Sequence, residues 1–133
     1  MVKYTGRDGK EYVLRFDMAA MEEMKEIFAG GYTEAMQKMS GGEMSQVKEV
    51  FRILAKSGEE YLAEKEGRTP AEVDVSGLLS RHSSPGRVKG VMKAIEEAIR
   101  DGNRMQTKDE EDDQVRDGYL EEFRKMELEN GKN

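Results

Sequence analysis

The side chains of this sequence that could support catalysis are few, and His82 is the only histidine among them. His82 lies in the polar run SRHSSPG, away from any carboxylate, in a chain with no cysteine. Such a setting is typical of a surface histidine rather than of a general base or a metal ligand. The sequence also lacks nucleophile-elbow, phosphate-loop and dinucleotide-binding motifs. We therefore predict a protein that is not an enzyme and needs no cofactor.

Residues 113–124 come nearest to a metal-binding pattern. Asp113, Asp117 and Glu121 have the spacing of ligands in a calcium loop. Val115, however, occupies the third ligand position, and Arg124 occupies the position of the carboxylate that closes such a loop. A cation at that position excludes Ca²⁺, so we predict no metal site and interpret the run DEEDD (109–113) as solvated charge.

Methionine is the most unusual component, with 10 among 133 residues. Three of them recur at helical spacing after residue 17, namely Met18, Met21 and Met24, and Phe28 follows four residues after Met24. One interpretation is core filling, because methionine adapts to irregular gaps. The other is an adaptable binding surface, and both hold if the stripe lies at the rim of a groove. The candidate partner-binding residues are Met18, Met21, Met24 and Phe28, with Tyr119 and Phe123 near the C-terminus.

The charge of the chain is unevenly distributed. Residues 1–100 carry 16 basic and 17 acidic side chains, whereas residues 101–133 carry 6 basic and 11 acidic ones. The resulting acidic extension on a nearly neutral body argues against a general nucleic-acid binder, which needs a basic face. No apolar run approaches the roughly 20 residues of a membrane span, and the N-terminus does not resemble a signal peptide. These features predict a cytoplasmic protein that does not bind membranes.

The N-terminal segment VKYTGRDGKEYVLRF predicts a β-hairpin, because Asp8-Gly9 is a strong turn signal. A two-residue loop would pair Tyr4 with Val13. A three-residue loop of residues 7–9, with Gly9 left-handed, would instead pair Tyr4 with Tyr12. Only the second register gathers the apolar side chains on one face, so we predict it. These side chains are Val2, Tyr4, Tyr12, Leu14 and Phe16.

Helices are predicted for most of the remaining chain. Asp17 has the character of an N-cap, Phe16 and Met21 have the spacing of a hydrophobic staple, and Gly30-Gly31 ends this first helix. Further apolar periodicity predicts helices at 32–39, 43–66, 70–81 and 85–100. The helix at 70–81 depends on the capping box TPAE and on proline at its first position, and it has a break near Gly77.

The chain divides into a compact domain, residues 1–102, and a C-terminal part, residues 103–133. Asp101-Gly102-Asn103 is expected to end the last core helix. A polar linker at 103–114 and an amphipathic helix at 115–128 are expected to follow. We predict an α+β fold, mostly α, in which an N-terminal β-hairpin packs on a small bundle of about four to five helices, with an acidic C-terminal extension.

Residues 75–95 contain no acidic side chain and four basic ones, namely Arg81, Arg87, Lys89 and Lys93. With Ser84-Pro85 between two predicted helices, the segment 69–99 has the pattern of a DNA-binding helix-turn-helix. The patch is small and lacks interleaved aromatic residues, so a solvated basic face is the favoured interpretation.

Two stretches resemble a known family. GKEYVLRFDMAAMEEMKEIF (9–28) is similar to the start of tail assembly chaperones of long-tailed bacteriophages and prophages, including the gene-transfer-agent group. Those chains begin with a hairpin whose second strand reads G-K-x-Y-x-L-x-F, followed at once by a helix. The similarity continues in FRILAKSGEEYLAEKEGRTPAEVDVSGLL (51–79) and in VKGVMKAIEEAI (88–99). It covers roughly residues 2–100.

The resemblance implies a non-catalytic role. Such proteins are thought to coat the tape-measure protein in the host bacterial cytoplasm before the tail tube forms, and to be absent from the finished virion. The implied partners are the tape-measure protein, the tail tube protein and further copies of the chain. The alternatives are a small prophage DNA-binding regulator that uses residues 69–99, and another phage morphogenesis protein such as a connector or tube component.

Overall fold

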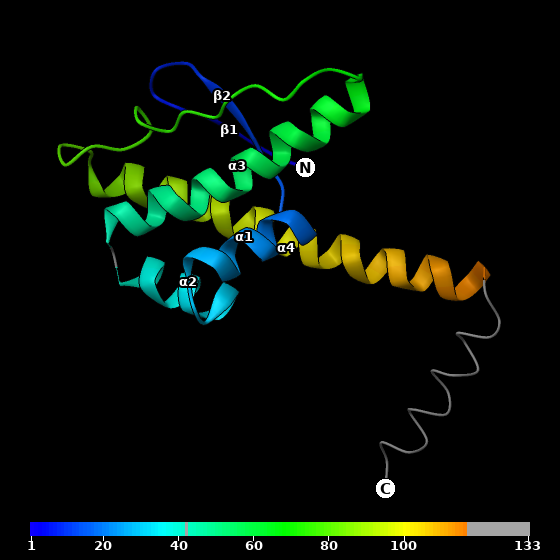
Figure 1. Ribbon diagram of the computed structural model, residues 1–133. Coiled ribbons are helices and arrows are strands. Elements are labelled where there is room, and N and C mark those ends of the chain that lie inside the picture. The colour runs from blue at the N-terminus through cyan, green and yellow to red at the C-terminus, as the bar shows by residue number, and fades with distance from the viewer. Residues whose placement is uncertain (42, 117–133) are drawn as a thin grey trace, which may run out of the picture. The chain divides into compact units, whose positions relative to one another are not determined.

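The computed structural model describes residues 1–41 and 43–116, with side chains described through residue 104. It confirms the predicted α+β class, with a two-stranded antiparallel hairpin followed by helices (Figure 1). Contacts group the chain into two compact units, Met1–Gly102 and Asn103–Asn133. The elements are β1 (Val2–Thr5), β2 (Glu11–Leu14), α1 (Met18–Ile27), α2 (Gly31–Ser40), α3 (Met44–Glu66) and α4 (Pro85–Arg116).

The hairpin has the predicted register. Tyr4 pairs with Tyr12, and Val2 pairs with Leu14. Gly9 has φ +80° in the three-residue loop, a conformation that glycine adopts without steric cost. One face of the hairpin therefore carries the apolar residues, and Tyr12 and Leu14 are buried on it.

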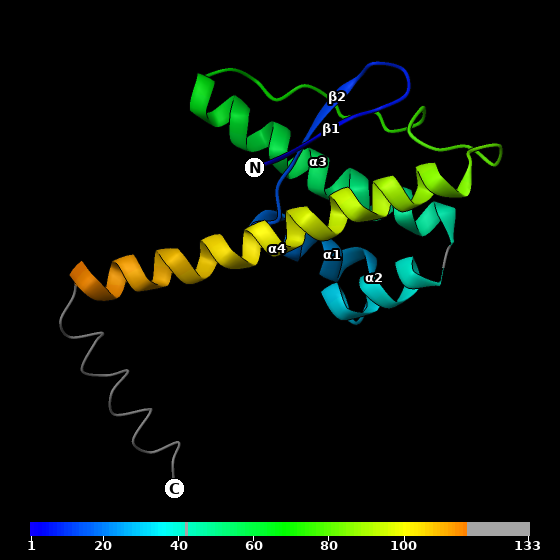
Figure 2. The same ribbon diagram turned by 180° about the vertical axis from the view of Figure 1, so that it is seen from behind.

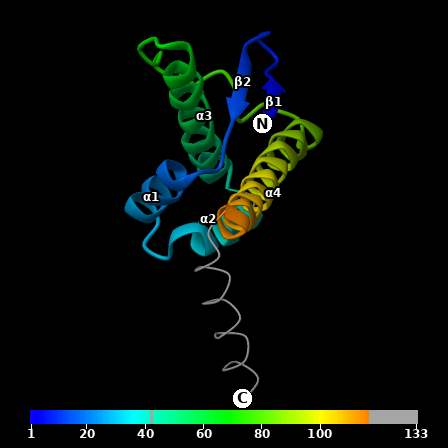
Figure 3. The same ribbon diagram turned by 90° about the vertical axis from the view of Figure 1, so that its right-hand side faces the viewer.

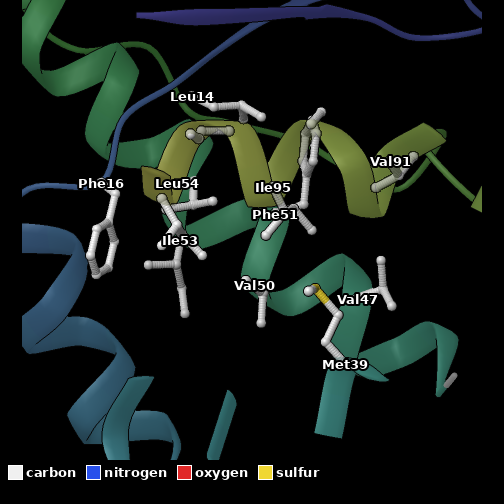
Figure 4. Packing of buried hydrophobic residues seen from close by; sticks show 14 of the residues in the cluster. Leu14, Phe16, Met39, Val47, Val50, Phe51, Ile53, Leu54, Val91 and Ile95 are labelled. Carbon is white, nitrogen blue, oxygen red and sulfur yellow. The ribbon is translucent and has the colours of Figure 1, made fainter. Parts of the chain in front are cut away.

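The hydrophobic core lies between the apolar face of the hairpin and the helices. Phe51 of α3 is fully buried, and its ring meets those of Tyr4 and Tyr12 edge-on at 5.6 and 5.2 Å. Side chains of α2, α3 and α4 continue the cluster beneath these rings (Figure 4). Its buried members on these helices include Met39, Val47, Val50, Ile53, Leu54, Val91 and Ile95.

Two glycines let β2 and the residues that follow it pass close to α3 and α4. An ideal Cβ on Gly58 would lie 2.6 Å from the carbonyl carbon of Val13 and closer still to its oxygen. An ideal Cβ on Gly102 would lie 2.8 Å from the Cβ of Phe16. Figure 3 shows β2 entering between α3 and α4, in agreement with these close approaches. The backbone amide of Arg15 then donates a 3.1 Å hydrogen bond to the carbonyl oxygen of Leu54 in α3.

The ends of α1 and α3 follow from their capping residues. The Asp17 side chain accepts a hydrogen bond from the amide of Ala20, as an N-cap does. The helix ends at Ile27 rather than at the predicted Gly30-Gly31, which lie in the turn before and at the start of α2. The predicted end of the long helix is confirmed, because Gly67 caps α3 with φ +66°.

The predicted helix at 70–81 is wrong. Residues 68–84, called the strap below, have an irregular, mostly extended backbone between α3 and α4 (Figure 2). The hydroxyl of Tyr12 and the amine of Lys10 both donate hydrogen bonds to the carbonyl oxygen of Asp74. That carbonyl would be needed for helical hydrogen bonding, so contacts with β2 replace the local preference for a helix.

The predicted end of the last core helix at residues 101–103 is also wrong, because α4 continues to Arg116. Gly102 does not stop the helix; it is required for the approach of Phe16. More than half of residues 103–116 are good helix formers, and this local preference favours continuation of the helix. The predicted linker at 103–114 is therefore helical, and most of the predicted helix at 115–128 lies outside the described residues.

Candidate protein-binding surface

The methionines of α1 do not share one environment. Met24 and the adjacent Phe28 are fully buried, whereas Met18 is 64% exposed and Met21 is half-buried. Each residue turns a helix by about 100°, so residues six positions apart point about 120° away from each other. The buried stripe of α1 accordingly consists of Ala20, Met24 and Phe28. Core filling is therefore the role of Met24 and Phe28, and the surface interpretation remains for Met18 and Met21.

Met18 and Met21 lie one helical turn apart at the start of α1, which follows Phe16 closely in the chain. The ring of Phe16, which precedes α1, lies 5.6 Å from the ring of Tyr32 at the start of α2. Tyr32 is 40% exposed, and Met21 packs against the core cluster that contains Phe16. We call Met18, Met21 and Tyr32 the α1 surface. Sequence reasoning missed Tyr32, whose position in the first turn of the short α2 gave no periodic signal.

Tyr119 and Phe123, the other predicted partner-binding residues, lie outside the described residues.

The strap is fastened to β2 and α3 by polar contacts. The amine of Lys10 and the hydroxyl of Tyr12 lie 2.9 and 3.1 Å from the carbonyl oxygen of Asp74. At the start of the strap, the guanidinium of Arg68 donates to the Glu59 carboxylate, and the pKa of Glu59 is lowered chiefly by this hydrogen bond. Burial, followed by the nearby acidic groups, raises the pKa of Tyr12. These contacts hold the strap without a backbone ladder to β2 among the described residues.

Depressions flank the strap on both sides. One of about 170 Å³ lies between the strap, β2 and α3, and two of about 450 Å³ lie on the side of Arg52. Arg52 donates to Glu23 of α1 at 3.1 Å and to Glu49 at 2.6 Å. The pKa of Arg52 is raised, first by the hydrogen bond to Glu49. Because this cation is already neutralised within the fold, Arg52 itself offers no strong anion site.

The other side chains that could take part in catalysis or metal binding are dispersed. His82 is exposed in the strap, where its backbone amide donates to the hydroxyl of Ser80 at 3.2 Å. The described residues contain no group of three acidic, histidine or cysteine side chains that could hold a metal ion. Residues 69–84 contain no helix, so the first helix of the helix-turn-helix predicted for 69–99 is absent.

The described residues thus define a small α+β protein, with a hairpin and helices around one core and a partly apolar α1 surface. None of the helices in this part of the chain combines the length and the apolar character that a membrane span needs. Comparisons with protein-family models, with curated proteins and with solved structures found no match.

Proposed function

We propose that this chain is a non-catalytic tail assembly chaperone of a bacteriophage or prophage. It binds the tape-measure protein in the host bacterial cytoplasm, helps to recruit tail tube subunits and is absent from the finished virion. The observation that carries the proposal is the order of β2, Asp17 cap and α1 within residues 9–28, the stretch that resembles this family. The hairpin and the immediately following helix are the elements that the resemblance implies.

The α1 surface supports the proposal on physical grounds. A tape-measure protein is long, helical and apolar in places, so it needs a partner that covers varied apolar segments. Met18 and Met21 are unbranched and polarizable and can adapt to different apolar groups. Met24 and Phe28 anchor α1 in the core, so the same helix has a fixed inner face and an adaptable outer one. Several weakly bound copies would then hold the client by avidity.

The gene neighbourhood offers the first test. We expect a slippery heptamer near the codon of Gly131, an overlapping short frame and then a very long frame with helical repeats. The product of that long frame should co-purify with this chain when the two are expressed together. Presence of the chain in purified virions would instead favour a connector or tube component, and a neighbourhood without these features would count against the proposal.

A pair of substitutions tests the α1 surface. Met18→Asp is expected to weaken client binding while thermal stability stays within about 0.5 kcal/mol, because the side chain is exposed. Met24→Asp is expected to unfold the protein, since an unpaired buried charge costs at least several kcal/mol and can equal the whole folding free energy of about 5–15 kcal/mol. Circular dichroism separates lost binding from lost structure. Unchanged client binding by Met18→Asp would exclude this surface.

A further inference from the structure

The first turns of α4 and the adjacent strap carry a positive surface. We call Arg81, Arg87, Lys89 and Lys93 the basic surface. Arg81, Lys89 and Lys93 are exposed, and Arg87 is half-buried. Residues 75–95 contain no acidic side chain, and none of the four cations forms an ion pair with another described residue. This contrasts with Arg52, which is held between two carboxylates.

These charges do not serve the stability of α4 itself. The N-terminus of a helix is the positive end of its dipole, where acidic side chains are stabilising and basic ones are not. The first turn of α4 contains no acidic residue, and Arg87 and Lys89 follow directly. The run of five acidic residues at 109–113 lies towards the opposite end of the same helix. The charge order of α4 is thus opposed to its dipole, which favours a role for these charges outside the helix.

Two glycines on the same part of α4, Gly86 and Gly90, are not explained by any close neighbour among the described residues. An ideal Cβ on Gly90 would meet no atom within 4 Å, and on Gly86 only the hydroxyl of Ser84 at 4.0 Å. Neither glycine has a positive φ. Glycine inside an exposed helix is destabilising relative to alanine. Gly86 and Gly90 are one turn apart, on the same face of α4 as Lys89 and Lys93. Because neither glycine has a side chain, the backbone of another helix can approach α4 closely at this face.

We propose that the basic surface binds the acidic run 109–113 of a second copy of this chain. The run supplies five consecutive carboxylates, and the surface supplies four cations with no ion-pair partner among the described residues of their own copy. The chain has a net charge of −6, so two copies attract only if the opposite charges are segregated, as they are here. The same net charge disfavours duplex DNA as the occupant.

This contact rests on the charges of the strap and α4 and on the glycines of α4, and it gives the several copies invoked in the proposed function a surface by which they associate. A contact of this kind can repeat from copy to copy, and its strength falls as salt screens the charges. Failure of self-association would leave the contact between a single copy and the client through the α1 surface unchanged, and loss of that contact would leave self-association unchanged.

Sedimentation velocity across a range of protein and salt concentrations tests the proposal. The full chain is expected to self-associate at low salt. The double variant Lys89→Glu/Lys93→Glu should raise the dissociation constant at least tenfold, and Glu110→Lys/Glu111→Lys should do the same. An equimolar mixture of the two variants should associate again, because the reversed surface of one now faces the reversed run of the other. Such a rescue cannot come from misfolded protein.

A matched control makes the same charge change elsewhere. Lys25→Glu/Lys65→Glu alters two exposed lysines of α1 and α3 and should self-associate like the natural chain. Three results would overturn the proposal: a monomer at every salt concentration, a mixture that fails to associate, or a control that fails as the basic-surface variant does. Salt-dependent binding of a duplex DNA probe without self-association would assign the surface to DNA instead.

Discussion

Replacement of Gly58 by alanine is expected to push the hairpin away from α3. The glycine is buried, and an added Cβ would lie 2.6 Å from the carbonyl carbon of Val13. Nonbonded carbon atoms normally lie about 3.5–4.0 Å apart, so β2 would have to retreat by about 1 Å. The opposing atoms are backbone, which cannot move aside as a flexible side chain can.

The retreat has a cost that can be estimated from the contacts it disturbs. Overpacking against rigid backbone costs about 3 kcal/mol, the upper end of the usual range. The 3.1 Å hydrogen bond from the Arg15 amide to the Leu54 carbonyl would weaken, a loss of about 1 kcal/mol. The higher helix propensity of alanine offsets about 1 kcal/mol of this destabilisation. The net destabilisation of about 3 kcal/mol corresponds to a melting temperature lower by roughly 10–15 °C.

Thermal and urea denaturation followed by far-UV circular dichroism measure this change. Gly67→Ala is the matched control, because Gly67 has φ +66° and no atom within 4 Å of an ideal Cβ. That substitution carries only the cost of a left-handed alanine, about 1 kcal/mol. If Gly58→Ala is no less stable than Gly67→Ala, the close approach of β2 to α3 does not exist and the reasoning fails.

Three further substitutions test the strap and the start of α1. Tyr12→Phe removes the hydroxyl that donates to the Asp74 carbonyl and should cost about 1 kcal/mol in urea denaturation. Ionised Glu59 is stabilised by Arg68, which lowers its pKa below the ordinary value of about 4.3. This contribution to stability is fully present above the ordinary pKa and is lost as pH falls through the lowered pKa. Glu59→Gln should therefore be less stable than the natural chain at pH 7, and the difference in stability between the two should disappear in acid. A gap that widens in acid would contradict this. Asp17→Ala should cost about 1 kcal/mol through loss of the cap, measured by thermal denaturation.

The hairpin and its register were predictable because two independent signals agree. Asp8-Gly9 marks the turn, and only one loop length places Tyr4 and Tyr12 on the same face. The strap was not predictable from the capping pattern at 69–72, because contacts distant in sequence decide its conformation. Val73 and Val75 alternate in the manner of an extended segment, a local signal that competed with the capping box.

The candidate surface was only partly predictable. Apolar spacing correctly predicted a helix that contains Met18 and Met24. Spacing alone does not tell which of the two is buried, because that depends on the elements that face the helix. The buried face of α1 is set by the position of α3, and this selects Ala20 and Met24. Alanine contributes little to an apolar pattern, so the true stripe was hidden by the more conspicuous methionines.

The sequence alone cannot distinguish a glycine that ends a helix from a glycine inside a helix that makes room for a neighbouring segment. The sequence Asp101-Gly102-Asn103 has the composition of a helix end, but Gly102 lies within α4 and makes room for Phe16. Gly58 serves β2 in the same way within α3. In both cases a second backbone segment explains why the helix tolerates a destabilising residue. Gly86 and Gly90 have no such neighbour in the part of their own chain that the structure describes, and by the same reasoning they favour a neighbour from another copy.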